Sequence, residues 1–236
     1  MGHPPEVARG SPDDPAGLQV LIHRLRGIAD EMGAILRRAS FSPNIKERAD
    51  CSAGLFTAGG ELLVQAEHIP VHLGSMPASV AAAIAFARGL GRPLEAGEQV
   101  MLNDPFDGGT HLNDITLVAP CLLGGRLVGW VANRAHHADV GGMVAGSIPP
   151  EADEIYQEGL RLPPSLLSPA VAAILCANSR TPEERRGDLD AQTGANLAGA
   201  DRFAEVAGSG VDLDAVCNYG ERRMRAAISD LPDGTW

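Results

Sequence analysis

The residues of this 236-residue sequence that are best suited to chemistry are histidines and aspartates gathered between positions 103 and 142. Three of the seven histidines and four aspartates fall inside this stretch, namely His111, His136, His137, Asp104, Asp107, Asp114 and Asp139. Imidazole nitrogens and carboxylate oxygens are the groups that hold divalent metals and move protons in enzymes. The stretch is therefore our candidate for a metal centre or an acid–base site.

The spacing His111-x-x-Asp114, completed by a histidine from further along the chain, offers two nitrogens and one oxygen. This donor set suits Zn²⁺, Mn²⁺ or Fe²⁺ and leaves positions open for water or substrate. A metal held there would polarise a carbonyl oxygen or supply hydroxide near neutral pH. In the alternative interpretation each side chain only caps a strand or pairs locally, which is the commoner case for a single histidine. Four acid–base residues brought together by one hairpin favour a site.

The element that would bring them together is a β-hairpin. Two mainly apolar runs, 115–122 and 126–133, are joined by a Leu-Gly-Gly turn and predict two interior strands. Antiparallel pairing sets the start of the first strand beside the end of the second. His111 and Asp114, just before the first strand, should therefore meet the histidine pair that follows the second.

The histidine pair itself, His136 and His137, should diverge. Adjacent residues on an extended chain point to opposite sides. One ring is therefore expected to bind the metal, while the other orients a ligand or contacts substrate. Glycine pairs at 108–109 and 141–142 would let backbone approach the site closely from both sides.

Around the hairpin the sequence predicts a mixed α+β fold, with antiparallel hairpins, flanking helices and a helical C-terminal part. Apolar residues recur every three or four positions over 15–40, which is the pattern of an amphipathic helix. Two short strands, 53–57 and 61–65, flank an Ala-Gly-Gly turn. The remaining predicted elements are a helix over 75–88, a strand over 98–102, and helices over 166–178, from 181 onward and over 212–229.

Residues 1–15 are rich in proline and glycine and predict a flexible lead-in to a domain over 16–236. Pro232-Asp233-Gly234 is a turn signal that a further strand normally follows. We therefore expect a domain truncated at its C-terminus, the N-terminal portion of a longer subunit. The glycine- and proline-rich stretch 141–164 is too long for a plain connection and predicts a binding loop.

A polar stripe, Asp188, Gln192 and Asn196, recurs at four-residue spacing along the helix predicted after residue 181. Such a stripe is usually solvated, but amides and a carboxylate that face a pocket produce the same pattern. The sequence leaves both alternatives open.

Bulk properties argue against several functions. A net charge of −11 without a basic run opposes nucleic-acid binding. No apolar run approaches the roughly 20 residues that a membrane span needs, and scattered cysteines without a C-x-x-C pair are typical of a cytoplasmic protein.

Neither G-x-x-x-x-G-K-[ST] nor G-x-G-x-x-G occurs, so the sequence shows no nucleotide site of its own. A nucleophilic Cys51 is an alternative for which no base is visible beside it.

Six motifs resemble the hydantoinase B/oxoprolinase family and follow one another in family order over nearly the whole chain. They are E-R-x-D-C-S at 47–52, H-I-P-V-H-L-G-S-M at 68–76, N-D-P-F-D-G-G-T-H-L-N-D at 103–114, H-H-A-D-V-G-G at 136–142, Q-E-G-L-R-L-P-P at 157–164 and G-D-L-D-A-Q at 187–192.

The resemblance implies a two-component enzyme. A hydantoinase A-type partner subunit would bind ATP and phosphorylate the substrate carbonyl, and the B-type subunit would complete the reaction at a divalent metal site. In the family's hydrolases water opens a lactam or cyclic imide, whereas in acetone and acetophenone carboxylases an enol captures CO₂ or bicarbonate. We therefore expect the B-type subunit of an ATP-dependent cyclic-amide hydrolase in a hetero-oligomer, with a carboxylase subunit acting on a ketone or an inactive fragment as alternatives.

Carried over by motif, the resemblance also implies roles for individual residues. The implied metal ligands are His111, Asp114 and His136, with His137 as the nearest rival. The resemblance implies two groups of residues in the substrate pocket. The candidates for catalysis are Asp50, His137, Asp139 and Glu158. The candidates for substrate binding are His68, His72 and Asp107.

Overall fold

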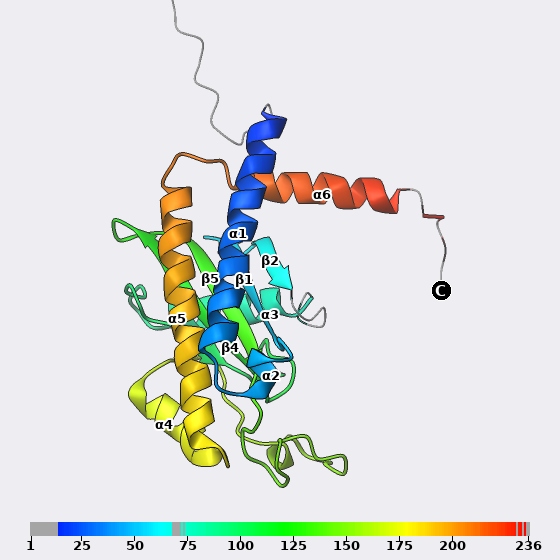
Figure 1. Ribbon diagram of the computed structural model, residues 1–236. Helices are drawn as coiled ribbons and strands as arrows, with labels where there is room; N and C mark the ends of the chain where they lie inside the picture. The colour runs from blue at the N-terminus through cyan, green and yellow to red at the C-terminus, as the bar shows by residue number, and fades with distance from the viewer. Residues whose placement is uncertain (1–13, 68–71, 73, 230, 233, 235–236) are drawn as a thin grey trace, which may run out of the picture.

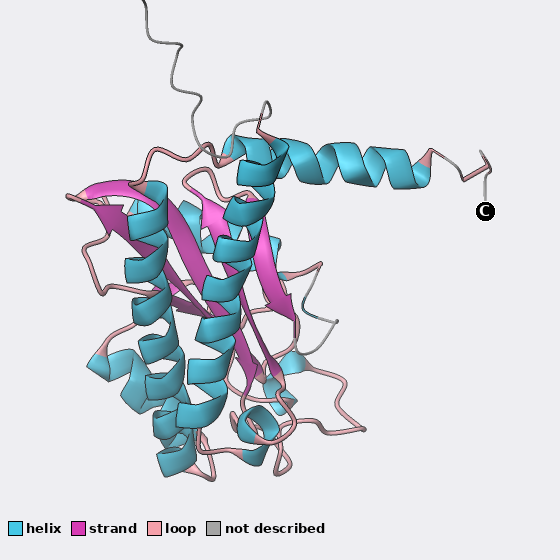
Figure 2. Cartoon of the chain, turned by 45° about the horizontal axis from the view of Figure 1, so that its top comes forward, coloured by secondary structure: helices cyan, strands magenta, loops and turns pink. Residues whose placement is uncertain are grey.

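The computed structural model describes residues 14–67, 72, 74–229, 231–232 and 234, which contain a six-stranded antiparallel sheet with helices on both faces (Figure 1, Figure 2). In chain order the strands are β1 (Cys51–Thr57), β2 (Leu62–Glu67), β3 (Val100–Leu102), β4 (Asp114–Leu123), β5 (Arg126–His136) and β6 (Ser165–Leu166). Across the sheet the order is β2-β1-β5-β4-β3-β6, and every pairing is antiparallel. The prediction of a mixed α+β fold built on hairpins is confirmed.

The helices are α1 (Pro15–Ala39), α2 (Pro43–Lys46), α3 (Met76–Gly89), α4 (Pro169–Asn178), α5 (Pro182–Ala207) and α6 (Asp214–Ile228), and Ile155–Gln157 form the 3₁₀ turn η2. α1 begins as its sequence predicts. The Asp14 carboxylate accepts a hydrogen bond from the Gly17 N–H at 2.9 Å, and Pro15 occupies the first turn, where no backbone donor is needed.

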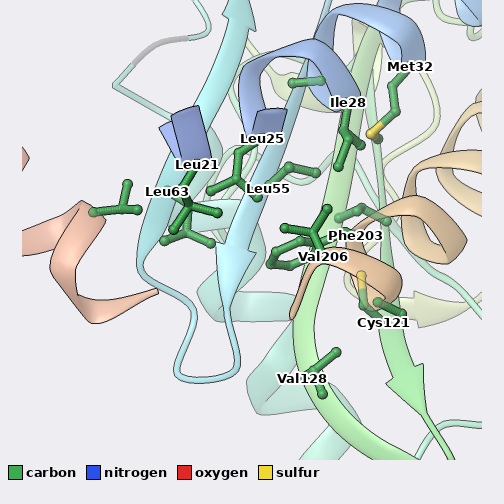
Figure 3. Close-up of a cluster of buried hydrophobic side chains, with 14 of the residues drawn as sticks. Leu21, Leu25, Ile28, Met32, Leu55, Leu63, Cys121, Val128, Phe203 and Val206 are labelled. Atoms are coloured by element: carbon green, nitrogen blue, oxygen red, sulfur yellow. The ribbon is translucent and has the colours of Figure 1, made fainter. Parts of the chain in front are cut away.

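One face of the sheet is covered by α1 and α5, which lie side by side across it (Figure 1). Leu25 and Met32 of α1 meet Leu55 of β1 and Phe203 of α5 in a single apolar cluster, which Figure 3 shows in close-up. The opposite face packs against α3 and forms a second apolar cluster, in which Trp130 of β5 is buried. Because both faces are covered, the central strands β5 and β4 lie in the interior.

The predicted hairpin is formed by β4 and β5, which are slightly longer than expected. Their pairing sets Asp114 directly opposite His136. Because the start of β4 lies beside the end of β5, the N-D-P-F-D-G-G-T-H-L-N-D motif lies next to the H-H-A-D-V-G-G motif. The topological inference from sequence is therefore confirmed.

Other elements differ from the predictions at their ends. Residues 165–166 form an unpredicted strand, β6, and the helix expected from 166 begins at Pro169, where Ser168 caps it. The strand expected over 98–102 is limited to Val100–Leu102. Residues 141–164 contain only the η2 turn, as a long loop would. Of the lead-in predicted over 1–15, residues 1–13 lie outside the described residues, whereas Asp14 and Pro15 form the cap and first turn of α1. His68 also lies outside the described residues. No helix in the described part of the chain is long and apolar enough to cross a membrane.

Candidate metal centre

Three of the predicted ligands converge at the end of the sheet where β4 begins and β5 ends. Asp114 is the first residue of β4, His136 is the last residue of β5, and His111 precedes β4 by one short turn. The backbone N–H of Asp114 donates to the carbonyl of His111 at 3.0 Å, which closes that turn and folds the histidine back over the strand end. The rings of His111 and His136 lie with their centroids 4.9 Å apart.

The distances between the donor atoms of this cluster match those between neighbouring ligands of a metal ion. His111 Nε2 lies 2.8 Å from Asp114 Oδ1 and 3.1 Å from His136 Nδ1, and His136 Nδ1 lies 3.3 Å from Asp114 Oδ1. With ligand bonds of about 2.1 Å, neighbouring donors are about 3.0 Å apart around an octahedral ion and about 3.4 Å apart around a tetrahedral one. Two imidazole nitrogens and one carboxylate oxygen therefore fit a divalent transition metal in both type and spacing.

Asp114 divides its two carboxylate oxygens between the cluster and its support. Oδ1 faces His111 and His136, whereas Oδ2 accepts a hydrogen bond from the Thr110 hydroxyl at 2.7 Å and lies 3.3 Å from His72 Nε2. Burial opposes ionisation of this carboxyl, but the close imidazoles of His111, His136 and His72 outweigh it and hold the pKa of Asp114 well below its usual range. The carboxylate is thus ionised at neutral pH, as a metal ligand must be.

The negative charge of Asp114 favours a protonated imidazole beside it. The hydrogen bond between His111 and Asp114 raises the pKa of His111, although partial burial of the ring opposes the increase. A metal would displace the proton shared between these groups and replace its charge.

His72 and Asp50 approach the cluster from two further elements. His72 is fully buried, with Nδ1 at 3.0 Å from the Ser52 hydroxyl of β1 and Nε2 facing Asp114. Asp50 precedes β1, and its carboxylate lies 3.9 Å from His136 Nδ1 while its side chain is 25% exposed. The partly exposed carboxylate of Asp50 therefore lies beside His136, and the buried ring of His72 lies behind Asp114.

His137 points away from His136, as adjacent residues on an extended chain should. Its ring is fully buried beneath α5, and Nε2 lies 2.8 Å from the side-chain oxygen of Gln192. Burial, reinforced by the nearby Arg185 charge, lowers the pKa of His137 to about 4, so the ring is neutral at physiological pH. The structure does not bring the His137 ring into the cluster.

Asp139 organises the loop that follows β5. Its carboxylate accepts hydrogen bonds from the backbone N–H groups of Gly141, Gly146 and Arg180, each at 3.1 Å, and from the Arg180 guanidinium at 3.0 Å. Burial tends to raise the pKa of Asp139, but these donors hold it below its usual range. Gly142 has φ +80°, and a Cβ there would lie 2.5 Å from the Gln157 carbonyl, so this position requires glycine.

The remaining predicted site residues lie on loops. Asp107 is exposed on the loop that carries Gly108, and Glu158 is half-buried just after η2. The catalytic and substrate-binding roles assigned to these residues, and to Asp139 and His137, stay predictions.

Two supporting hydroxyls, those of Thr110 and Ser52, were not among the predicted site residues. Each stands beside a residue that it did name, within the G-G-T-H and D-C-S motifs. Local sequence gave no sign that either hydroxyl would reach Asp114 or His72. A nucleophilic Cys51 is not supported, since its side chain is fully buried and this burial raises the pKa of the thiol to about 12.

Comparison with known proteins identifies the family. A hydantoinase B/oxoprolinase model matches residues 14–236. The chain belongs to this family. Among curated relatives, 5-oxoprolinase of Saccharomyces cerevisiae is 38% identical over 203 residues, which are 79% of this chain and 16% of the yeast enzyme.

Solved structures agree with this assignment to the hydantoinase B/oxoprolinase family. ATP-dependent caprolactamase from Pseudomonas jessenii superposes with a TM-score of 0.84 and 33% identity, over 95% of this chain and 40% of that one. An acetone carboxylase has the same fold, with a TM-score of 0.83 and 18% identity over 95% of this chain and 32% of the other. This family member thus spans less than half the length of each protein it is compared with.

Proposed function

We propose that this chain is the metal-bearing part of an ATP-dependent enzyme that hydrolyses a cyclic amide such as a hydantoin, 5-oxoproline or another lactam. The observation that carries the proposal is the set of three closely spaced donor atoms from His111, Asp114 and His136. Kinship with proteins named 5-oxoprolinase and caprolactamase supports the reaction class.

The chain's own residues would divide the work as follows. His111, Asp114 and His136 would hold Zn²⁺, Mn²⁺ or Fe²⁺. When bound, the ion would polarise a carbonyl oxygen and lower the pKa of water. The His111 side chain is 42% exposed, so the cluster opens to solvent on that side and substrate can approach there. The partly exposed Asp50 carboxylate lies beside His136 and would accept or donate the proton that moves during ring opening.

The ATP site would belong to a partner subunit. The sequence contains neither of the two glycine-rich phosphate-binding motifs, and the matching caprolactamase is named as ATP-dependent. We infer a hydantoinase A-type subunit that binds ATP and activates the carbonyl, joined to this chain in a hetero-oligomer.

Metal content tests the site directly. The chain is purified and loaded separately with Zn²⁺, Mn²⁺ and Fe²⁺, and bound metal is quantified by mass spectrometry after dialysis. We expect about one ion per chain in the wild type, which the His111→Ala and Asp114→Asn variants lose. His23→Ala, at an exposed position on α1, is the matched control and should keep its metal. Full metal retention in both cluster variants would refute the ligand assignment.

Activity tests the reaction. With an A-type subunit and ATP, 5-oxoproline, hydantoin and caprolactam are offered as substrates, and ring opening is followed by chromatography. Acetone with labelled bicarbonate is offered in parallel, and label fixed into a stable acid would favour the carboxylase alternative. A chain that binds metal yet turns over none of these substrates would support the inactive-fragment alternative.

A further inference from the structure

Gln192 of α5 holds the ends of both ligand-bearing strands from the face of the sheet opposite to the metal centre. Its side-chain nitrogen donates to the Ile115 carbonyl and to Asn133 Oδ1, both at 2.9 Å. Its side-chain oxygen lies 2.8 Å from Nε2 of His137. All three polar side chains in this group are fully buried.

The contacts of Gln192 fall beside the ligands in sequence. Ile115 directly follows Asp114, and His137 directly follows His136, while Asp114 and His136 are themselves cross-strand partners. A single buried amide therefore fixes the two chain segments from which two of the three donors project. Because successive side chains alternate across a strand, the amide can do this without occupying the metal face.

The amide also fixes the tautomer of His137. Since the Gln192 nitrogen donates to two oxygens, its oxygen must face the imidazole, and His137 Nε2 must donate. The Asn113 side chain donates to the His137 carbonyl at 2.8 Å, and the His137 N–H donates to the Asn113 carbonyl at 2.8 Å. His137 is thereby held at both its ring and its backbone, and His136 follows its position.

We propose that Gln192 is a positioning residue for the metal centre, setting the separation of the Asp114 and His136 donors through Ile115 and His137. The inference rests on the proposed metal site and adds to it a residue from a different helix. Removal of a group that hydrogen-bonds a metal ligand directly typically lowers metal affinity by about 10- to 100-fold. Gln192 acts one residue away from the ligands, so the lower end of that range is the expected effect.

Asn196 provides a control that is matched in chemistry. It lies one helical turn further along α5, is also fully buried, and likewise makes three side-chain hydrogen bonds, to Gln99, the Leu117 carbonyl and Asn133. None of these three partners is adjacent in sequence to a proposed ligand. Asn196→Leu therefore removes the same number of buried hydrogen bonds as Gln192→Met, but away from the centre.

The experiment measures Zn²⁺ and Mn²⁺ dissociation constants by chelator competition for the wild type, Gln192→Met and Asn196→Leu, with urea unfolding recorded for each. We expect metal affinity to fall about 10-fold in Gln192→Met, the lower end of the effect of direct ligand partners, and less than about threefold in Asn196→Leu, at comparable losses of stability. If Gln192→Met does not fold, Gln192→Asn, shorter by one methylene and still an amide, replaces it with the same expectation.

The outcomes separate the two proposals. Equal affinity in the wild type and the Gln192 variant would overturn the positioning role and leave the metal site standing. An equal loss in the Gln192 and Asn196 variants would also overturn it, because the effect would then follow general stability. A wild type that binds neither ion would overturn the metal site itself and this inference with it.

Discussion

Gly129 of β5 determines how closely α5 can lie on the sheet, and Gly129→Ala tests that reading of the fold. A Cβ at this position would lie 2.3 Å from Cε1 of Phe203 and 2.6 Å from the Phe56 carbonyl oxygen, whereas ordinary contacts are 3.4–4 Å. The Phe203 ring is fully buried in the apolar cluster that α5 shares with α1 and the sheet, so it cannot swing into solvent. The Phe56 oxygen belongs to the neighbouring strand, whose pairing with β5 limits its movement.

The magnitude follows from two opposing effects. Alanine is favoured over glycine inside a strand by about 0.5–1 kcal/mol. Against this, the ring must withdraw by about 1 Å in a packed core, and such overpacking costs about 1–3 kcal/mol. Since ring and backbone both clash, the upper part of that range applies, and we expect the free energy of unfolding to fall by about 2 kcal/mol.

Urea unfolding followed by circular dichroism measures this change. Gly194→Ala is the control, because a Cβ there, on α5 itself, meets nothing within 4 Å. The control should gain up to about 1 kcal/mol from helix propensity. If Gly129→Ala were as stable as the wild type, or shifted in the same direction as Gly194→Ala, the close seating of α5 on β5 would be refuted.

Three further predictions address the core, a thiol and a surface ion pair. Leu25→Ala should cost about 2–5 kcal/mol in urea unfolding, since Leu25 is fully buried. A thiol reagent at pH 8 should label half-exposed Cys217 promptly and Cys51 only as the chain opens; prompt labelling of Cys51 would contradict its burial. Hydrogen bonds from Arg92 lower the pKa of Glu98 from 4.5 to about 2, so this pair's contribution to stability is present above pH 4.5 and is lost as the pH falls toward 2. An NMR titration should show that midpoint, and Arg92→Ala should return it toward 4.5; an unchanged midpoint in that variant would contradict the assignment.

The convergence of the candidate ligands could be predicted because it depends on local rules. An apolar run, a Leu-Gly-Gly turn and a second apolar run specify a hairpin, and antiparallel register then sets Asp114 opposite His136 whatever the rest of the chain does. His111 is only three residues from Asp114 and comes with it. The divergence of His136 and His137 follows from strand geometry in the same way.

Short elements were harder to predict for the same physical reason. β6 consists of Ser165 and Leu166 alone, and it exists because β3 offers its edge: Val100 pairs with Leu166 and Met101 pairs with Ser165. No periodicity can be read from two residues, so a strand of this kind is specified by its partner and not by its own sequence.

The polar stripe on α5 marks the limit of sequence reasoning most clearly. Asp188, Gln192 and Asn196 are all fully buried, although their spacing is the same as that of a solvated face. What decides between the alternatives is the set of partners: Gln192 meets residues 55 to 77 positions away, and Asp188 receives the N–H groups of Phe41 and Ser42 from 147 and 146 positions away. Burying such groups is favourable only when every partner is in place, because an unpaired buried amide costs about 1–3 kcal/mol. The stripe therefore restricts α5 to one packing position on the sheet. In that position α5, although remote in sequence, holds the strand ends that carry Asp114 and His136.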